Sequence, residues 1–154
     1  MRNNHPFIDS INNSHYLVAY LMIFMNYHCA IKMQNDKCGI YRSVILKDDN
    51  NNIPNSIDKN IKQFITLWKC TIGQYTLYDN IKEHKMISKK GLDVYMHITS
   101  PIRRLVDLLN IAIIQENLNL FKLSKSYMIF QKKWIDNLEY INKTMRSIRK
   151  VQNT

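Results

Sequence analysis

The chain has 154 residues, of which 45% are hydrophobic and 22% are charged. This length and composition exclude an intrinsically disordered chain and allow either one domain with a modest core or a piece of a larger domain. The formal net charge of +10 indicates a polyanionic partner, with nucleic acid ahead of an anionic membrane surface.

Only three glycines and three prolines are present, so helices are expected to dominate over short strands joined by tight turns. The three cysteines, Cys29, Cys38 and Cys70, are odd in number and lack a C-x-x-C spacing. This argues against a disulfide framework and a zinc site, and predicts a reducing, cytoplasmic compartment. Abundant Asn, Ile, Lys and Tyr, whose codons are rich in A and T, favour an AT-rich genome such as that of a large DNA virus.

The first thirteen residues lack the apolar core of a signal peptide. Apolar residues spaced three and four apart then predict a helix over 14–37, with Ser14 as its N-cap and Gly39 beyond its end. The longest apolar run, 17–31, is shorter than the roughly 20 residues that a membrane span needs. We therefore expect a buried helix and no membrane partner.

A β-branched stretch from Gly39 predicts a short extended segment, followed by a loop rich in Asp and Asn that ends near Pro54. In that loop Asp48 and Asp49 are adjacent carboxylates without a third acid nearby. They are interpreted as solvated loop residues, so no metal site is predicted there. A second helix is predicted to begin at Ser56 or Asp58 and to end near residue 69.

A third, short helix is predicted over 75–84, and a β-hairpin over 85–98, where Gly91 supplies the positive φ of the turn. Ser100 as N-cap and Pro101 as the first helical residue then predict a helix that ends near Glu116. A final helix is predicted over 124–151. Its lysines and arginines form either a solvated basic face or a contact for a polyanion.

The start of the helix after Ser100 carries the strongest chemical signal. Arg103 and Arg104 would lie in its first turn, where unpaired N–H groups attract anions and disfavour cations. A bound phosphate would explain both arginines, because backbone N–H groups and a bidentate guanidinium would converge on it. Alternatively, one arginine pairs with Asp107, which leaves the other for a ligand.

The stretch YMHITSPIRRLVDLLN, residues 95–110, resembles the signature of the RNB family of 3′→5′ exoribonucleases, which includes ribonucleases II and R. That signature runs approximately Y-x-H-F-T-S-P-I-R-R-Y-x-D-L. Upstream, residues 14–26 are similar to the family's helix with an L-V/I-E-E motif, and residues 39–42 resemble its L-Y-R motif. Downstream, Ile141 and Asn142 resemble the L-N of its late helix. The likeness spans nearly the whole chain and corresponds to the C-terminal part of the family's domain.

The resemblance implies a mostly α fold with a small β-hairpin, in which residues 1–154 form the C-terminal fragment of an α/β RNB catalytic domain. It implies single-stranded RNA as the partner, held in a basic channel. By position, Arg103 would act on the scissile phosphate as the catalytic arginine, and Ser100 and Arg104 would be further phosphate contacts. The family's magnesium is held by an aspartate segment that precedes this part of the domain.

This sequence carries no counterpart of that aspartate segment, so no metal or cofactor is expected to bind the chain alone. Magnesium is expected only if the missing aspartate segment is supplied. The chain departs from the family elsewhere as well, in its glutamate pair, in the tyrosine after R-R and in the final H-R. These positions hold Ala19, Tyr20, Leu105, Ile111 and Ala112.

Three hypotheses follow. In the first, the chain is an RNB-like fragment that binds single-stranded RNA but does not hydrolyse it alone. In the second, it is one half of a split, active exoribonuclease whose aspartates come from a partner polypeptide. In the third, it is a helical interaction module without RNA activity. The sequence leaves open whether RNA or DNA is preferred.

Overall fold

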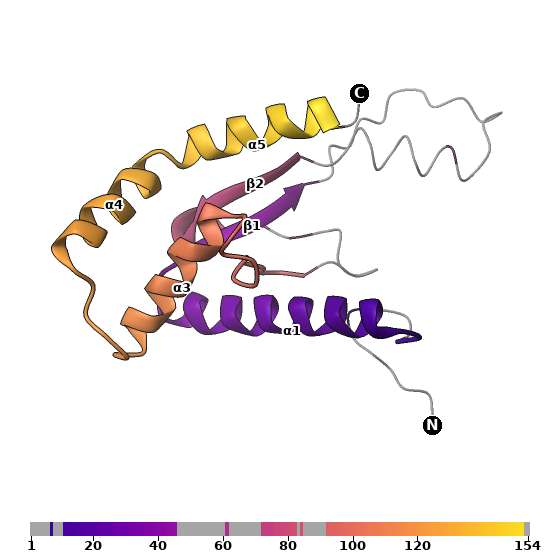
Figure 1. Cartoon of the computed structure of the whole chain (residues 1–154), viewed down its shortest axis with the longest axis horizontal. Helices are drawn as coiled ribbons and strands as arrows, with labels where there is room; N and C mark the ends of the chain where they lie inside the picture. The colour runs from indigo at the N-terminus through magenta and orange to yellow at the C-terminus, as the bar shows by residue number, and fades with distance from the viewer. Residues whose placement is uncertain are drawn as a thin grey trace.

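A computed structural model describes residue 7 and residues 11–45, 61, 72–82, 84 and 92–152. These residues form four α-helices, one 3₁₀ helix and a two-stranded antiparallel sheet (Figure 1). In chain order the elements are α1 (Ser14–Asn35), β1 (Ile40–Ile45), β2 (Ile72–Leu77), η1 (Tyr78–Asn80), α3 (Leu105–Asn117), α4 (Lys125–Asp136) and α5 (Leu138–Gln152). The described part of the chain is therefore mostly helical, as its composition predicts.

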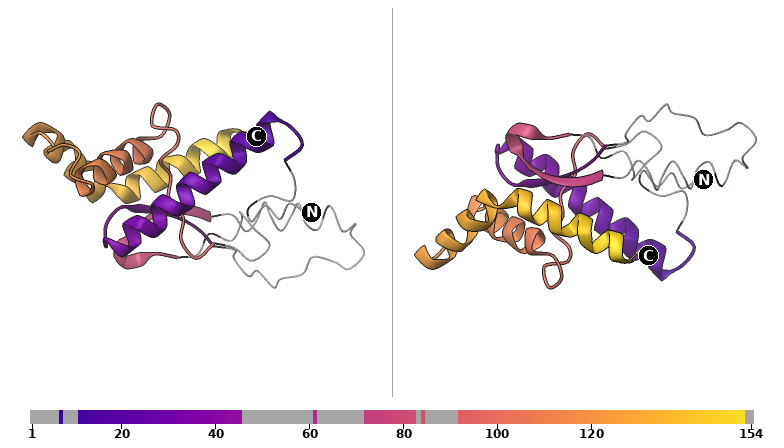
Figure 2. Two further views of the ribbon diagram at one scale, coloured as in Figure 1. Left: turned by 90° about the horizontal axis from the view of Figure 1, so that it is seen from below. Right: turned by 90° about the horizontal axis from the view of Figure 1, so that it is seen from above.

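The sheet lies between α1 on one side and α5 on the other (Figures 1 and 2). Alternate side chains of a strand point to opposite faces, so neighbouring residues of β1 enter different cores. Tyr41 packs with Ala30 and Met33 of α1, whereas Ile40 packs with Leu109 of α3 and Leu138 of α5. Two small hydrophobic cores thus hold the helices against the sheet.

β1 pairs along both of its edges. On one edge it runs antiparallel to β2, from Ile40 opposite Leu77 to Ile45 opposite Ile72. On the other edge the Arg42 N–H donates to the Tyr95 carbonyl at 2.7 Å, and Tyr41 bridges to Met96. The segment 94–98, which leads to the conspicuous arginine pair, is therefore fixed to the centre of the fold.

Several expected elements are confirmed. The first helix ends at Asn35, close to the predicted end, although Asn13 rather than Ser14 caps it by accepting from the Tyr16 N–H at 3.1 Å. The extended stretch after Gly39 is β1. Of the hairpin predicted over 85–98, residues 85–91 lie outside the described residues, and Leu92 exchanges two backbone hydrogen bonds with His84 just before that range. The predicted second helix also lies outside them, except for Ile61, which is helical.

The predicted third helix is wrong, because residues 72–77 form β2 and only Tyr78–Asn80 form a 3₁₀ turn. β1 supplies a pairing partner that the local sequence does not reveal. The final helix is also divided: α4 ends at Asp136, and the backbone N–H and side-chain amide of its C-cap residue Asn137 both donate to the Lys133 carbonyl. Among the described residues, no helix combines the length and the apolarity that crossing a membrane requires.

Candidate functional site

A compact turn, Ser100–Arg104, precedes α3. The backbone N–H groups of Arg103 and Arg104 both donate to the Ser100 carbonyl, at 3.3 and 3.1 Å. Helix α3 begins only at Leu105, with Arg104 as its N-cap residue. The prediction that Ser100 caps this helix and Pro101 opens it is therefore wrong, because a separate turn holds these residues ahead of the helix.

Asp107 explains why the turn is separate. Its carboxylate is fully buried and accepts from the Ser100 N–H at 2.8 Å. The same carboxylate receives a bidentate pair from Arg104, with Nε at 2.8 Å and Nη2 at 2.9 Å. A carboxylate without solvent is stable only when it is paired and hydrogen-bonded, and the turn supplies both partners. Asp107 therefore fixes the shape of the turn, and Arg104 neutralises it.

Arg103 has a different environment from Arg104. Its side chain is exposed, and among the described residues its one recorded polar contact is a long one of 3.5 Å from Nη2 to Ser100 Oγ. The preceding residue, Ile102, is fully exposed. Of the two possibilities that the sequence left open, Arg104 is the arginine that pairs with Asp107. Arg103 is exposed and has no recorded pairing with Asp107.

Two asparagines hold the strand that leads into the turn. Asn110 of α3 accepts from the Ile40 N–H at 2.9 Å and donates to the carbonyls of Ile40 and His97, at 2.8 and 3.0 Å. Asn26 of α1 accepts from the Ile98 N–H at 3.0 Å and donates to the Tyr95 hydroxyl at 2.9 Å. The backbone before Ser100 is thus anchored from two helices.

A cluster of aromatic and basic side chains lies behind this strand. The Tyr75 hydroxyl is 2.8 Å from Nδ1 of His97, and the buried Arg42 guanidinium lies 5.0 Å from the centre of the Tyr75 ring. The His84 ring is 4.7 Å from the Tyr95 ring. Burial, followed by the charge of Arg42, lowers the pKa of His84 from 6.5 to about 4, so this imidazole is neutral at pH 7.

Sequence reasoning did not find this cluster. The match of residues 39–42 to the L-Y-R motif included Arg42 but gave it no role, and nothing linked it to Tyr75 or His84. Gly73 shows how the chain accommodates the arginine, because a Cβ atom at that position would collide with the Arg42 guanidinium. In the register of the two strands Gly73 lies opposite Val44 and Tyr75 lies opposite Arg42, so no local pattern could have indicated this contact.

The positions that depart from the RNB pattern contribute mostly to packing. Leu105 lies against the core formed by Ile40 and Val106, and Ala112 is buried. The Tyr20 ring stacks near the Phe24 ring at 6.3 Å. Within the described ranges, no group of three or more His, Cys, Asp or Glu side chains is placed to hold a metal ion. Asp48, Asp49 and Cys70 lie outside the described residues.

No protein-family model matches the chain, and no curated protein matches its sequence. The likeness to the RNB signature therefore rests on the residues themselves, above all on Tyr95–Asn110. What that segment could do chemically follows from its geometry: an exposed guanidinium and a hydroxyl lie side by side on a turn that a buried ion pair makes rigid.

Proposed function

We propose that this chain is an RNB-type segment that binds single-stranded RNA through the turn before α3 and does not hydrolyse RNA by itself. The observation that carries the proposal is that the two adjacent arginines have different environments. Arg104 forms an ion pair with the buried Asp107, whereas Arg103 is exposed next to Ser100. A guanidinium and a hydroxyl on a fixed turn suit a phosphate oxygen pair.

The rigidity of the turn supports a binding role for Arg103. A mobile loop would have to be ordered when a ligand binds, and that ordering would reduce the affinity. Here the Asp107 carboxylate already fixes the backbone of Ser100 and the side chain of Arg104. The net charge of +10 favours the approach of a polyanion to the whole chain.

Hydrolysis is a separate matter from binding. In RNB enzymes, metal-held aspartates activate the attacking water, and two-metal chemistry needs several carboxylates. The sequence has no counterpart of that segment, and Ala19 and Tyr20 occupy the positions of the family's glutamate pair. We therefore propose that magnesium-dependent activity requires an aspartate segment supplied from outside residues 1–154.

A second candidate function is one half of a split exoribonuclease. The N-terminal half of α1 favours it, because Leu17, Val18 and Leu21 are each about half exposed and form an apolar surface that a complementary polypeptide would cover. Co-purification with a polypeptide that carries an aspartate-rich segment, together with metal-dependent nuclease activity of the complex, would establish it.

Binding of a labelled single-stranded RNA to wild type and Arg103→Ala, at several salt concentrations, tests the proposal. We expect the substitution to weaken binding by about 1–3 kcal/mol and to reduce the dependence of log affinity on log salt by roughly 0.7. Arg103→Lys should recover only part of the loss, because lysine keeps the charge but lacks the planar fork.

The matched control is Lys82→Ala, which removes an exposed cation outside both the turn and the C-terminal helices. Equal small losses at positions 103 and 82 would mean that charge acts diffusely, and the proposed phosphate contact would be wrong. The same RNA incubated with protein and Mg²⁺ or Mn²⁺ should keep its 3′ end. Shortening that stops in EDTA would contradict the claim that the chain is inactive alone.

A further inference from the structure

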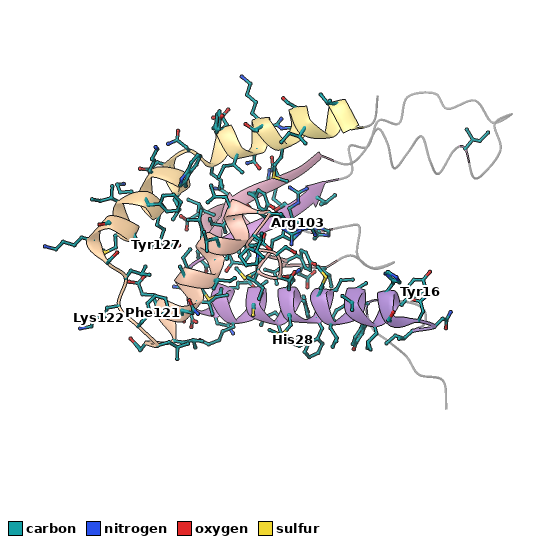
Figure 3. The ribbon with its side chains drawn as sticks, in the orientation of Figure 1. Tyr16, His28, Arg103, Phe121, Lys122 and Tyr127 are labelled. Carbon is teal, nitrogen blue, oxygen red and sulfur yellow. The ribbon has the colours of Figure 1, made fainter. Side chains whose placement is uncertain are left out.

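Helix α4 and the loop before it, residues 118–136, are unusually exposed and are together called the α4 surface. None of the residues of α4 is buried. Figure 2 shows α4 projecting beyond the sheet and α1, at the far end of α3. Phe121 and Lys122, which precede it, lie at the opposite end of α3 from Arg103 (Figure 3). The α4 surface is therefore separate from the turn that holds Arg103.

Aromatic rings follow one another along this helix. The Tyr127 and Phe130 ring centres are 5.8 Å apart, and those of Phe130 and Trp134 are 6.4 Å apart. Trp134 packs against the core at the α5 end of the row, whereas Phe130 is exposed. Phe121 in the loop adds another exposed ring. Tyr127 is half-buried and its hydroxyl is buried, so protein covers the row at both ends and Phe130 between them is exposed.

Lysines are interspersed with the rings. Residues 118–135 contain four lysines and no acidic residue. Lys132 pairs with Asp136 at 3.2 Å, whereas no acidic partner is recorded among the described residues for Lys122, Lys125 and Lys133. The Lys133 ammonium also lies 5.7 Å from the centre of the Trp134 ring. The surface thus combines positive charge with aromatic faces.

We propose that the α4 surface is a second contact for single-stranded RNA, which extends the RNA-binding function proposed above and rests on it. Bases stack on exposed aromatic rings without sequence preference, and lysines between the rings neutralise phosphates. An anionic membrane would also attract the lysines, but a row of aromatic rings with lysines beside them matches a nucleic-acid strand more closely than a lipid surface.

The distance between the two contacts predicts a dependence on RNA length. Helix α3 has 13 residues and separates Arg103 from the loop by about 20 Å at 1.5 Å per residue. A stacked strand carries one phosphate per about 3.4 Å, so about six nucleotides are needed to span the two contacts. A four-nucleotide RNA can occupy one contact at a time, whereas a strand of about fifteen can occupy both.

The test compares oligouridylates of four and fifteen nucleotides binding to the full chain. In wild type the longer strand should bind more tightly by a large factor, because its second contact is intramolecular. In Phe130→Leu, which keeps an apolar side chain but removes the ring, that length advantage should fall about 5-fold or more. The double variant Lys122→Ala, Lys125→Ala should lower the salt slope for the longer strand by roughly 1.4.

Lys82→Ala serves as the charge control, and equal melting temperatures confirm that each variant is folded. An unchanged length advantage in both α4 variants overturns the inference while leaving the Arg103 contact intact. Loss of binding to phosphatidylserine-containing vesicles, with RNA binding unchanged, overturns it in favour of a lipid surface. If wild type binds neither oligomer, the proposed function itself fails and the inference fails with it.

Discussion

The central sheet and the outer helices differ in how completely their groups are partnered. Around the sheet, asparagines from three different helices bind strand backbone: Asn26 from α1, Asn110 from α3 and Asn142 from α5, which both accepts from and donates to Tyr75. On the outer faces of α1 and α4, by contrast, large apolar side chains remain in solvent. Specific packing contacts are therefore concentrated at the sheet, whereas the apolar side chains on the outer faces are not covered by this core.

The largest decrease in the free energy of unfolding is expected for Asn110→Ala. The side chain is fully buried, and its loss leaves the Ile40 N–H and the carbonyls of Ile40 and His97 without these partners. Unsatisfied buried groups cost about 1–3 kcal/mol each before relaxation, so we expect a loss of about 3 kcal/mol in the free energy of unfolding. Urea unfolding measures it.

The matched control is Asn117→Ala, at the exposed end of the same helix. The same side chain is replaced on the same helix, and Asn117 makes only a long contact of 3.8 Å from Nδ2 to Cys38 Sγ, so the difference between the variants reports mainly the buried contacts of Asn110. Similar small losses for the two variants would show that Asn110 does not hold the sheet.

The sequence predicted the helical character and several elements, but not what joins them. Local periodicity identified α1, and the β-branched stretch identified β1, because those signals are carried within each segment. β2 was mistaken for a helix since its partner lies about thirty residues earlier. Asn110 contacts Ile40 across 70 positions. Its role depends on tertiary proximity, which no local pattern carries.

The candidate site was predictable in part, because its residues lie in one short segment of the sequence. The residues Ser100, Arg103, Arg104 and Asp107 lie close together in the sequence, so their juxtaposition could be expected. Which arginine pairs with Asp107 could not be predicted, because i+3 and i+4 pairings both fit a helix. The turn ahead of α3 decides it, and that turn exists because Asp107 also accepts from the Ser100 N–H.

Acidification should destabilise the protein through His84, which is buried beside the sheet. The folded-state pKa of His84 is lowered to about 4 by burial and by Arg42, whereas the unfolded chain has the ordinary value of 6.5. As pH falls below 6.5 the unfolded state binds the proton first, so the stability present at neutral pH is lost progressively until about pH 4. We expect His84 to contribute a loss of about 2 kcal/mol between pH 7 and pH 5.

His84→Phe isolates this contribution, because phenylalanine fills a similar volume and does not titrate. Contributions that wild type and variant share cancel in the comparison, so the measured quantity is the change in urea stability between pH 7 and pH 5 for each protein. If wild type and variant lose the same amount on acidification, His84 is not the buried neutral base that the structure indicates.

The smallest effect on stability is expected on the outer faces. Leu17→Gln together with Leu21→Gln replaces two half-exposed side chains of α1, and substitutions at such positions change stability by about 0.5 kcal/mol or less. Their effect should appear in association instead. Exposed contiguous apolar surface favours self-association and dye binding, so wild type should self-associate, bind dye or both, and the double variant should show less of either.

Ile129→Gln on α4 is the control variant, because it removes an even more exposed side chain from the other face. If self-association or dye binding decreases more in the α1 double variant than in Ile129→Gln, the surface responsible lies on α1, where a complementary polypeptide is proposed to bind. A wild-type chain that is monomeric, melts sharply and binds no dye would show that these faces are stable in water, and the contrast with the sheet would then carry no consequence for partners.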